Sequence, residues 1–240
     1  MLVYACTQKG VNKAENEDRI VVGKSIIAEG TFSCEVNNGI IAVADGVGGN
    51  NAGYVASHFV ASKLCTLRGT SSELFIDINN ELIALSQTKS EFNGMATTLA
   101  GISLRPDCAE LFYVGNSRVY SLQSGKYLKQ LTKDDTTLNF LLETGQLSQQ
   151  DADNFSRKNE ITSCFGGGNA GIFKIKYSLV SPFNSPVLMT SDGIHDHLTV
   201  DNMEDIIAET GISMQTCNKM IEAARNNGSK DDISVVLGVI

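Results

Sequence analysis

The 240-residue sequence contains no tryptophan, only three prolines and only three histidines. No apolar run approaches the roughly 20 residues that a helix needs to span a bilayer. The first residues also lack the basic-then-apolar layout of a secretory signal. No Gly/Ser-rich or Pro-rich stretch divides the chain, so we expect a single domain over residues 1–240.

The six cysteines are scattered, and neither a CxxC nor an HxxxH motif occurs, which argues against a Cys/His zinc site. Each cysteine stands among apolar or small residues, as reduced buried thiols do. Because disulfides are rare in the cytosol, the sequence predicts a cytoplasmic protein. No cysteine is followed six positions later by arginine, as a cysteine-based phosphatase requires. GxSxG is also absent, which argues against a serine hydrolase.

Acidic residues outnumber basic ones by 27 to 19, which gives a net charge of −8. Such a surface repels nucleic acids and anionic membranes, so we expect neither as a partner. Metal binding is a second explanation for the excess of acidic residues. Carboxylates that bind metal ions are neutralised by cations that the sequence does not count.

Short β-branched runs bounded by turn residues predict strands. These runs cover 2–8, 19–23, 39–45, 97–104, 109–115, 117–123, 126–131, 171–180, 186–192 and 230–240. Apolar residues at three- and four-residue steps predict helices near 52–64, 74–85, 200–210 and 213–227. A helix–turn–helix is expected over 132–155, with Thr132 and Ser148 as caps, and hairpin turns at 105–107 and 124–125.

Strands in runs joined by hairpins, with helices inserted in pairs, indicate an α+β fold. We predict two antiparallel β-sheets packed as a sandwich with helices on both outer faces, an αββα arrangement.

Four acidic clusters each stand where a turn joins an apolar strand. They are Glu17-Asp18, Asp45-Gly46, Asp192-Gly193 and Asp231-Asp232. An ionised carboxylate at the edge of a core is costly unless it is paired or bound to metal. Hard oxygen ligands favour Mg²⁺ or Mn²⁺ over zinc. Any one pair taken alone is better explained by a turn, but four pairs that abut buried strands favour a metal site.

The ordered motifs of this chain resemble those of the metal-dependent PPM protein phosphatases, also called type 2C, in their bacterial form. The matching runs are NED at 16–18, ADGVGG at 44–49, GMATTLAG at 94–101, VGNSRVY at 114–120, LTKDDT at 131–136, TSDGIHD at 190–196 and GSKDDISVV at 228–236. The resemblance implies hydrolysis of phosphoserine and phosphothreonine in proteins by a water activated between two Mg²⁺ or Mn²⁺ ions.

The resemblance also implies roles for individual residues. Asp45 would contact both ions, with the Gly46 carbonyl as a further ligand, and Asp192 and Asp231 would complete the first ion's ligands. Glu17 and Asp18 would hold the second ion directly or through water. Residues 132–160 would form the family's flap beside the active site.

Three positions depart from the family pattern. Lys13 stands where an arginine grips the substrate phosphate, and lysine cannot make a bidentate contact; a solvated surface lysine is the alternative. Asn116 replaces an aspartate that helps to hold a third ion with Asp192 and Asp196; it keeps one oxygen but loses the charge. Val47 stands where eukaryotic members carry a histidine general acid.

Two other functions remain open on sequence grounds. The departures at Lys13 and Asn116 would suit a non-catalytic module of the same fold that binds partners. A Ca²⁺-stabilised structural domain is a third possibility. For the phosphatase, we expect phosphorylated protein substrates of a cognate Ser/Thr kinase and a monomeric state.

Overall fold

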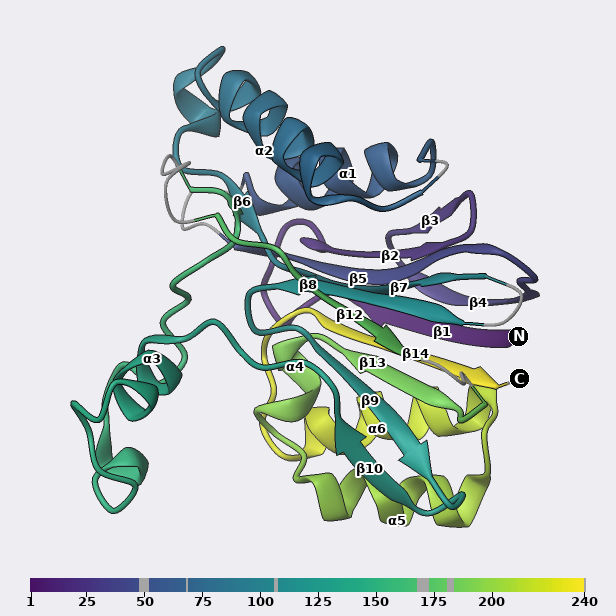
Figure 1. Cartoon of the computed structure of the whole chain (residues 1–240). Coiled ribbons are helices and arrows are strands. Elements are labelled where there is room, and N and C mark those ends of the chain that lie inside the picture. Colours follow the sequence, from purple (N-terminus) through teal and green to yellow (C-terminus); the bar gives the residue numbers. More distant parts are fainter. Residues whose placement is uncertain (48–51, 68, 106–107, 168–172, 181–183, 240) are drawn as a thin grey trace.

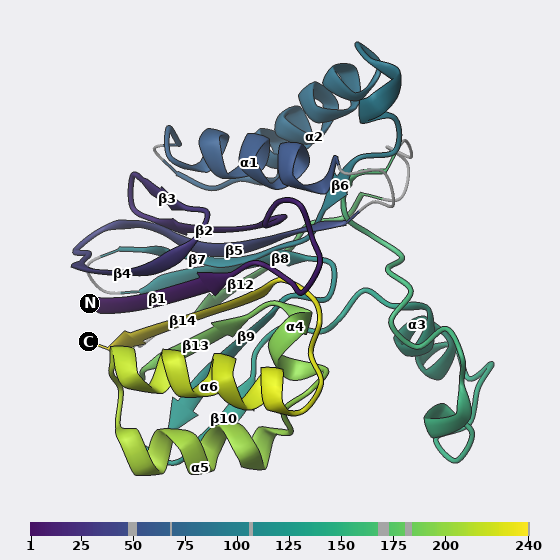
Figure 2. The same cartoon turned by 180° about the vertical axis from the view of Figure 1, so that it is seen from behind.

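Two antiparallel β-sheets face each other, and helices cover the outer face of each (Figures 1 and 2). This computed structural model describes residues 1–240 except 48–51, 68, 106–107, 168–172, 181–183 and 240. The expected turn at 105–107, the start of the strand at 171–180 and the end of the ADGVGG run therefore lie partly outside the described residues. The predicted αββα fold is confirmed.

The first sheet has six strands. Their order is β10 (Tyr127–Gln130), β9 (Arg118–Gln123), β13 (Val187–Thr190), β14 (Ile233–Val239), β1 (Leu2–Gln8) and β4 (Gly30–Glu35). In the β1–β14 pair, Leu2 lies opposite Val239. The two ends of the chain therefore lie side by side (Figure 1).

The second sheet is built around β5 (Gly39–Val47). Its main path is β11 (Phe165–Gly166), β6 (Ala96–Thr97), β5, β7 (Leu99–Leu104), β8 (Ala109–Val114) and β12 (Lys176–Val180), and β2 (Asp18–Val22) pairs with both β5 and β3 (Ser25–Ile27). Ile41 and Val43 of β5 face the other sheet, whereas Ile40 and Ala42 face the helices. Burial on both faces explains why this strand is apolar throughout.

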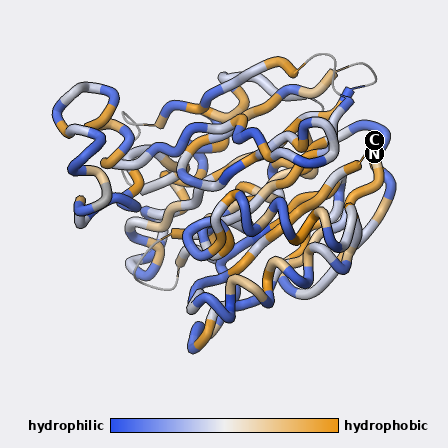
Figure 3. The backbone as a smooth tube through the Cα atoms, turned by 90° about the horizontal axis from the view of Figure 1, so that it is seen from below, coloured by the Kyte–Doolittle hydropathy of each residue, from blue (hydrophilic) through white to orange (hydrophobic). Residues whose placement is uncertain are grey.

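Helices α1 (Gly53–Leu64) and α2 (Ser72–Ser86) cover the second sheet, and α5 (Val200–Thr210) and α6 (Met214–Asn226) cover the first. The hydropathy-coloured trace shows apolar stretches along the inner strands and alternating character along the helices (Figure 3). Ser71, Thr199 and Ser213 each accept a hydrogen bond from a backbone N–H of the first turn, as helix N-caps do.

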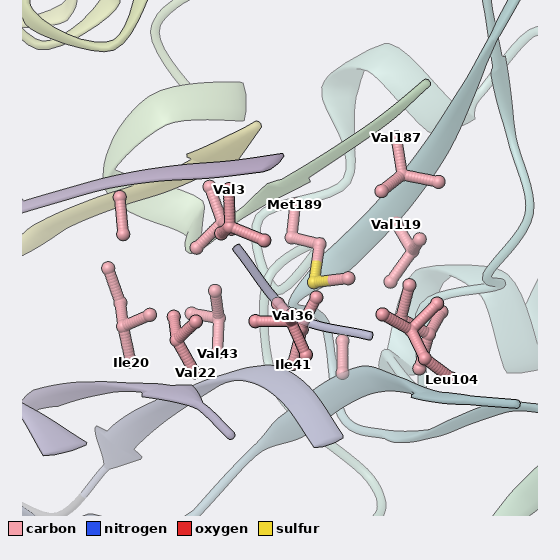
Figure 4. Packing of buried hydrophobic residues seen from close by; sticks show 14 of the residues in the cluster. Val3, Ile20, Val22, Val36, Ile41, Val43, Leu104, Val119, Val187 and Met189 are labelled. Atoms are coloured by element: carbon pink, nitrogen blue, oxygen red, sulfur yellow. The ribbon is translucent and has the colours of Figure 1, made fainter. Parts of the chain in front are cut away.

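Between the sheets lies a core to which both contribute, including Ile20, Val43, Val119 and Met189 (Figure 4). Each fully buried aliphatic side chain of this kind stabilises the fold by about 1.5–3 kcal/mol relative to exposure. This core fixes how one sheet is placed on the other, and therefore which strand ends meet.

Several local predictions differ from the structure. Strands β3 and β4 and the one-turn helix α4 (Asp192–His195) were not predicted. In α2 the buried aromatic residue is Phe75, whereas Leu74 is 38% exposed. The hairpin at 124–125 is confirmed, since Ser124 and Gly125 both have positive φ, at 53° and 67°.

The prediction for 132–155 is partly wrong. One helix, α3 (Thr137–Glu143), begins at the cap Thr136, and a 3₁₀ turn, η2 (Ala152–Asn154), replaces the second helix. Thr132 cannot act as the cap, because its hydroxyl instead accepts a hydrogen bond from the Val119 N–H at 3.2 Å. No residue of α3 is buried, and the segment projects away from both layers (Figures 1 and 2).

The one remaining short helix is η1 (Ser90–Phe92). Among the residues that the structure describes, no helix combines the length and apolar character needed to cross a membrane.

Candidate active site

Asp18 and Asp45 come from neighbouring antiparallel strands and lie directly opposite each other in the β2–β5 register. Two like charges in a cross-strand pair repel each other. The backbone of Asp45 is held firmly, because its N–H donates to Thr98 Oγ1 at 3.2 Å and its carbonyl accepts from the Thr98 N–H at 2.8 Å. The second sheet therefore presents two fixed carboxylates at one strand end.

The first sheet supplies Asp192 and Asp231. Asp192 follows β13 and begins α4, and Asp231 precedes β14. Because β13 and β14 are antiparallel neighbours, the end of one and the start of the other meet. Ser191 links the sheets: its hydroxyl donates to Asp18 Oδ2 at 2.8 Å and accepts from the Ser234 N–H at 2.9 Å. Sequence reasoning missed Ser191, whose only signal is its place beside Asp192.

Burial and mutual repulsion oppose ionisation of Asp45, Asp18 and Asp192. Burial, and then the charges of Asp192, Asp18 and Asp231, raise the pKa of Asp45 well above its ordinary value. Burial is also the main cause that raises the pKa of Asp18 to about 7, and it raises the pKa of Asp192, where the charge of Asp231 adds to it. The carboxyl groups of such a cluster can ionise together at low cost only when a cation lies beside them.

Several buried oxygens have no hydrogen-bond partner among the residues that the structure describes. They are Glu17 Oε1, Asp18 Oδ1 and Asn116 Oδ1. A buried acceptor without a partner is costly, and all three are hard oxygens of the kind that Mg²⁺ and Mn²⁺ prefer. Within the described part of the chain, no three histidine, cysteine or acidic side chains are already arranged to enclose a metal ion. The oxygen donors are of the kind that divalent cations bind. They lie near one another but do not yet enclose an ion.

The Gly46 carbonyl belongs to the same cluster. A Cβ atom on Gly53, at the start of α1, would lie 2.7 Å from Gly46 O and 2.6 Å from Glu17 Oε1. These two oxygens therefore converge on one point, and only glycine leaves them room. Sequence analysis did not single out Gly53.

Lys13 faces the acidic cluster and is not a freely solvated surface lysine. Its Nζ lies 3.0 Å from Asp232 Oδ2 and 3.5 Å from Glu17 Oε2, and it also contacts Asp231 Oδ1. Burial alone would lower the pKa of Lys13, but hydrogen bonds to Asp231 and Asp232 raise it overall. The ammonium group therefore stays charged beside the cluster.

Asp232 belongs to one of the four acidic clusters, but the sequence assigns it no individual role. Its side chain is 2% exposed. One oxygen accepts the Gly10 N–H at 2.6 Å, and the other accepts the Glu17 N–H at 2.8 Å and contacts Lys13. It thus binds the loop between β1 and β2 rather than the other aspartates.

Asn116 and Asp196 both lie beside Asp192. The Asn116 amide donates to Asp192 Oδ2 at 3.1 Å. Burial first, and then the charge of Asp192, raise the pKa of Asp196 to about 6. Asn159, from the 132–160 segment, donates to Asp196 Oδ2 at 2.5 Å.

The base of the 132–160 segment is fixed by two aspartates. Asp134 accepts hydrogen bonds from Arg118 Nε at 3.0 Å and Nη2 at 2.6 Å. Asp135 accepts hydrogen bonds from the Gly115 N–H at 3.1 Å and from Lys176 Nζ at 2.5 Å. The segment is therefore anchored firmly where it leaves β10, although its helix is exposed.

The histidines take no part in the acidic cluster. His195 is buried in α4, its Nδ1 is 2.7 Å from Thr190 Oγ1, and burial holds its pKa well below the ordinary value. His195 therefore has a packing role, and neither His195 nor His197 lies on a strand.

Comparison with known proteins agrees with this geometry. The family model described as "Protein phosphatase 2C" matches residues 29–225. The chain is 31% identical to the serine/threonine phosphatase stp of Listeria monocytogenes, over 96% of this chain and 92% of that protein. The chain belongs to the protein phosphatase 2C family. The family assignment made from the ordered motifs is therefore confirmed.

Solved structures share the protein phosphatase 2C fold. The Mycobacterium tuberculosis serine/threonine phosphatase PstP/Ppp superposes with a TM-score of 0.81 at 24% identity, over 99% of this chain and 98% of that one. Stp1 from Staphylococcus aureus gives a TM-score of 0.82 at 24% identity, over 100% and 95%.

Proposed function

We propose that this protein hydrolyses phosphoserine and phosphothreonine in other proteins with the help of two divalent cations. The observation that carries the proposal is the meeting of Asp18 and Asp45 from one sheet with Asp192 and Asp231 from the other. Family membership supports the same chemistry. The proposal takes residues 1–240 as one catalytic domain with 132–160 as its flap.

In this proposal, Asp45 would be shared by both ions, with the Gly46 carbonyl as a further ligand. Asp192 and Asp231 would hold the first ion, and Glu17 and Asp18 would hold the second directly or through water. A structure of PstP in complex with two manganese ions supports this number and type of cofactor. When bound, such ions lower the pKa of a water and neutralise charge on the phosphoryl oxygens.

The chain's own groups have separate tasks. Lys13, held beside the cluster, attracts and orients the dianionic phosphate of the substrate. Thr98 fixes the Asp45 backbone, and Ser191 orients Asp18. Together they hold the acidic groups close despite their repulsion, which is the geometric condition for activating a water next to phosphorus.

A non-catalytic module of the same fold is the alternative. Lys13 and Asn116 motivated it, but Lys13 faces the site, and the expected carboxylates all remain in the chain. Phosphoprotein substrates from a cognate kinase, the monomeric state and the cytoplasmic location stay predictions.

The test is hydrolysis of p-nitrophenyl phosphate and of phosphoserine, phosphothreonine and phosphotyrosine peptides with Mn²⁺ or Mg²⁺. We expect activity that EDTA removes and that Asp45→Ala abolishes, with a preference for the first two peptides. Asp205→Asn, an exposed aspartate of α5, is the matched control. A folded protein that is inactive in every metal would favour the binding module, and stabilisation by Ca²⁺ without activity would favour the structural domain.

A further inference from the structure

The side chain of Asp232 binds three donors from one loop. The carboxylate accepts the Gly10 N–H at 2.6 Å and the Glu17 N–H at 2.8 Å, and Lys13 Nζ lies 3.0 Å from Oδ2. All three donors belong to the connection between β1 and β2. Because Asp232 is buried, these contacts are shielded from solvent and contribute more than exposed ones.

The loop cannot easily shift relative to Asp232. The Val11 N–H donates to Lys230 O at 2.8 Å, and a Cβ on Gly10 would lie 2.6 Å from the same oxygen. The backbone therefore packs directly on residues 230–232, and the position of Lys13 is fixed relative to Glu17 and Asp231.

Asp231 and Asp232 differ in what they can do for Lys13. Asp231 is half exposed, with 51% of its side chain accessible, and it contacts the same ammonium. In the proposed function Asp231 binds a cation, which takes it away from Lys13. Both oxygens of Asp232 already accept hydrogen bonds from backbone N–H groups, so Asp232 is poorly placed to bind a cation. It can therefore keep its contact with Lys13.

We propose that Asp232 is a positioning residue that anchors the Lys13 ammonium beside the acidic cluster, where it meets the phosphate of the substrate. This inference rests on the proposed phosphatase function. An ammonium group has three N–H donors. When Asp231 and Glu17 bind cations as proposed, one N–H stays directed to Asp232, which leaves two for the phosphate oxygens.

A double-mutant cycle of Asp232→Asn and Lys13→Met tests the inference. Asparagine keeps the size of the side chain and at least one acceptor for the loop amides, but it removes the charge that holds Lys13. With p-nitrophenyl phosphate and Mn²⁺, we expect Asp232→Asn to raise KM by about tenfold and to leave kcat within about threefold. The double mutant should be no worse than Lys13→Met alone.

Glu29→Gln is the matched control, because Glu29 also accepts a backbone N–H of this loop, from Lys9 at 3.1 Å, but does not contact Lys13. Its KM should stay at the wild-type value. If Asp232→Asn raises KM as much in the Lys13→Met protein as in the wild type, Asp232 merely supports the loop and the inference is wrong.

Urea unfolding of the same four proteins in EDTA gives a readout that does not depend on turnover. We expect Asp232→Asn to destabilise the Lys13→Met protein measurably less than the wild type. Strictly additive losses would show that the two side chains do not interact and would overturn the inference. An inactive wild type would instead reject the phosphatase proposal, and the role at the phosphate would fall with it.

Discussion

The carboxyl groups of Asp18 and Asp45 stand opposite each other across two hydrogen-bonded strands, both buried. In most sheets this arrangement would be selected against, because paired like charges destabilise the ladder. Its presence here makes the protein sensitive to whatever neutralises these groups, whether protons or metal ions.

The stability of the metal-free protein should fall as pH rises. Burial and neighbouring charges raise the pKa of Asp45 and Asp18 in the folded state, the latter to about 7. Between about pH 4, where an unfolded aspartate ionises, and pH 7, the folded state binds more protons than the unfolded state. The contribution of these two carboxyls to the free energy of unfolding in EDTA therefore decreases across this window.

Asp45→Asn removes part of this dependence. We expect the variant in EDTA to be more stable than the wild type at pH 7.5 and to differ little from it at pH 4, while losing all activity. Urea unfolding at pH 4, 5, 6 and 7.5 measures the effect, with Asp205→Asn as the unchanged control. A wild type whose stability is flat or rises over this range would contradict the buried-carboxylate interpretation.

Divalent cations should stabilise the folded protein. At a 100-fold excess over the dissociation constant, one bound ion raises the melting temperature of a chain of this size by about 5–10 °C. The shift should shrink at pH 5, because protons compete for the same oxygens. Differential scanning fluorimetry with MnCl₂ or MgCl₂ checks this against NaCl of equal ionic strength. Equal shifts for the wild type and Asp192→Asn would place the binding elsewhere.

Lys13→Arg should bind substrate more tightly. Arginine presents a planar fork that contacts two phosphate oxygens at once, whereas the ammonium is a point charge. We expect KM for p-nitrophenyl phosphate to fall about threefold. Lys9→Arg, on the same loop but directed to the Ala14 carbonyl, should change nothing. Unchanged KM and kcat for Lys13→Arg would remove Lys13 from phosphate binding.

Asn116→Asp should create a stronger third cation site. The Asn116 side-chain N–H now donates to Asp192, and its oxygen has no partner in the described part of the chain. A carboxylate there would join Asp192 and Asp196, so we expect higher kcat at millimolar Mn²⁺ and a metal dependence with an added weak phase. Without metal the variant should be less stable by about 1–3 kcal/mol, since a hydrogen bond becomes a repulsion. A metal dependence identical to that of the wild type would argue against a site at this position.

The acidic positions and most strands could be predicted because their signals are local. A carboxylate at the end of an apolar run is visible in the sequence, as at Asp45, and so is the all-apolar pattern of a strand buried on both faces. The roles of Asp232, Ser191 and Gly53 could not be predicted, because each depends on partners from a distant segment. Thr132 shows the same limit. The residues around it predict a helix cap, but its hydroxyl accepts a hydrogen bond from the Val119 N–H of β9.

Each sheet supplies two of the four aspartates, and side-chain packing between the layers sets how the sheets lie against each other. A cation held at this seam would act as a non-covalent cross-link between the layers, so its affinity depends on how well the interior fits. Truncation of Met189, which lies in the interlayer core (Figure 4), would then weaken cation binding without any contact with the ion. Substitutions that create cavities in this core would therefore raise the concentration of magnesium or manganese that the protein needs.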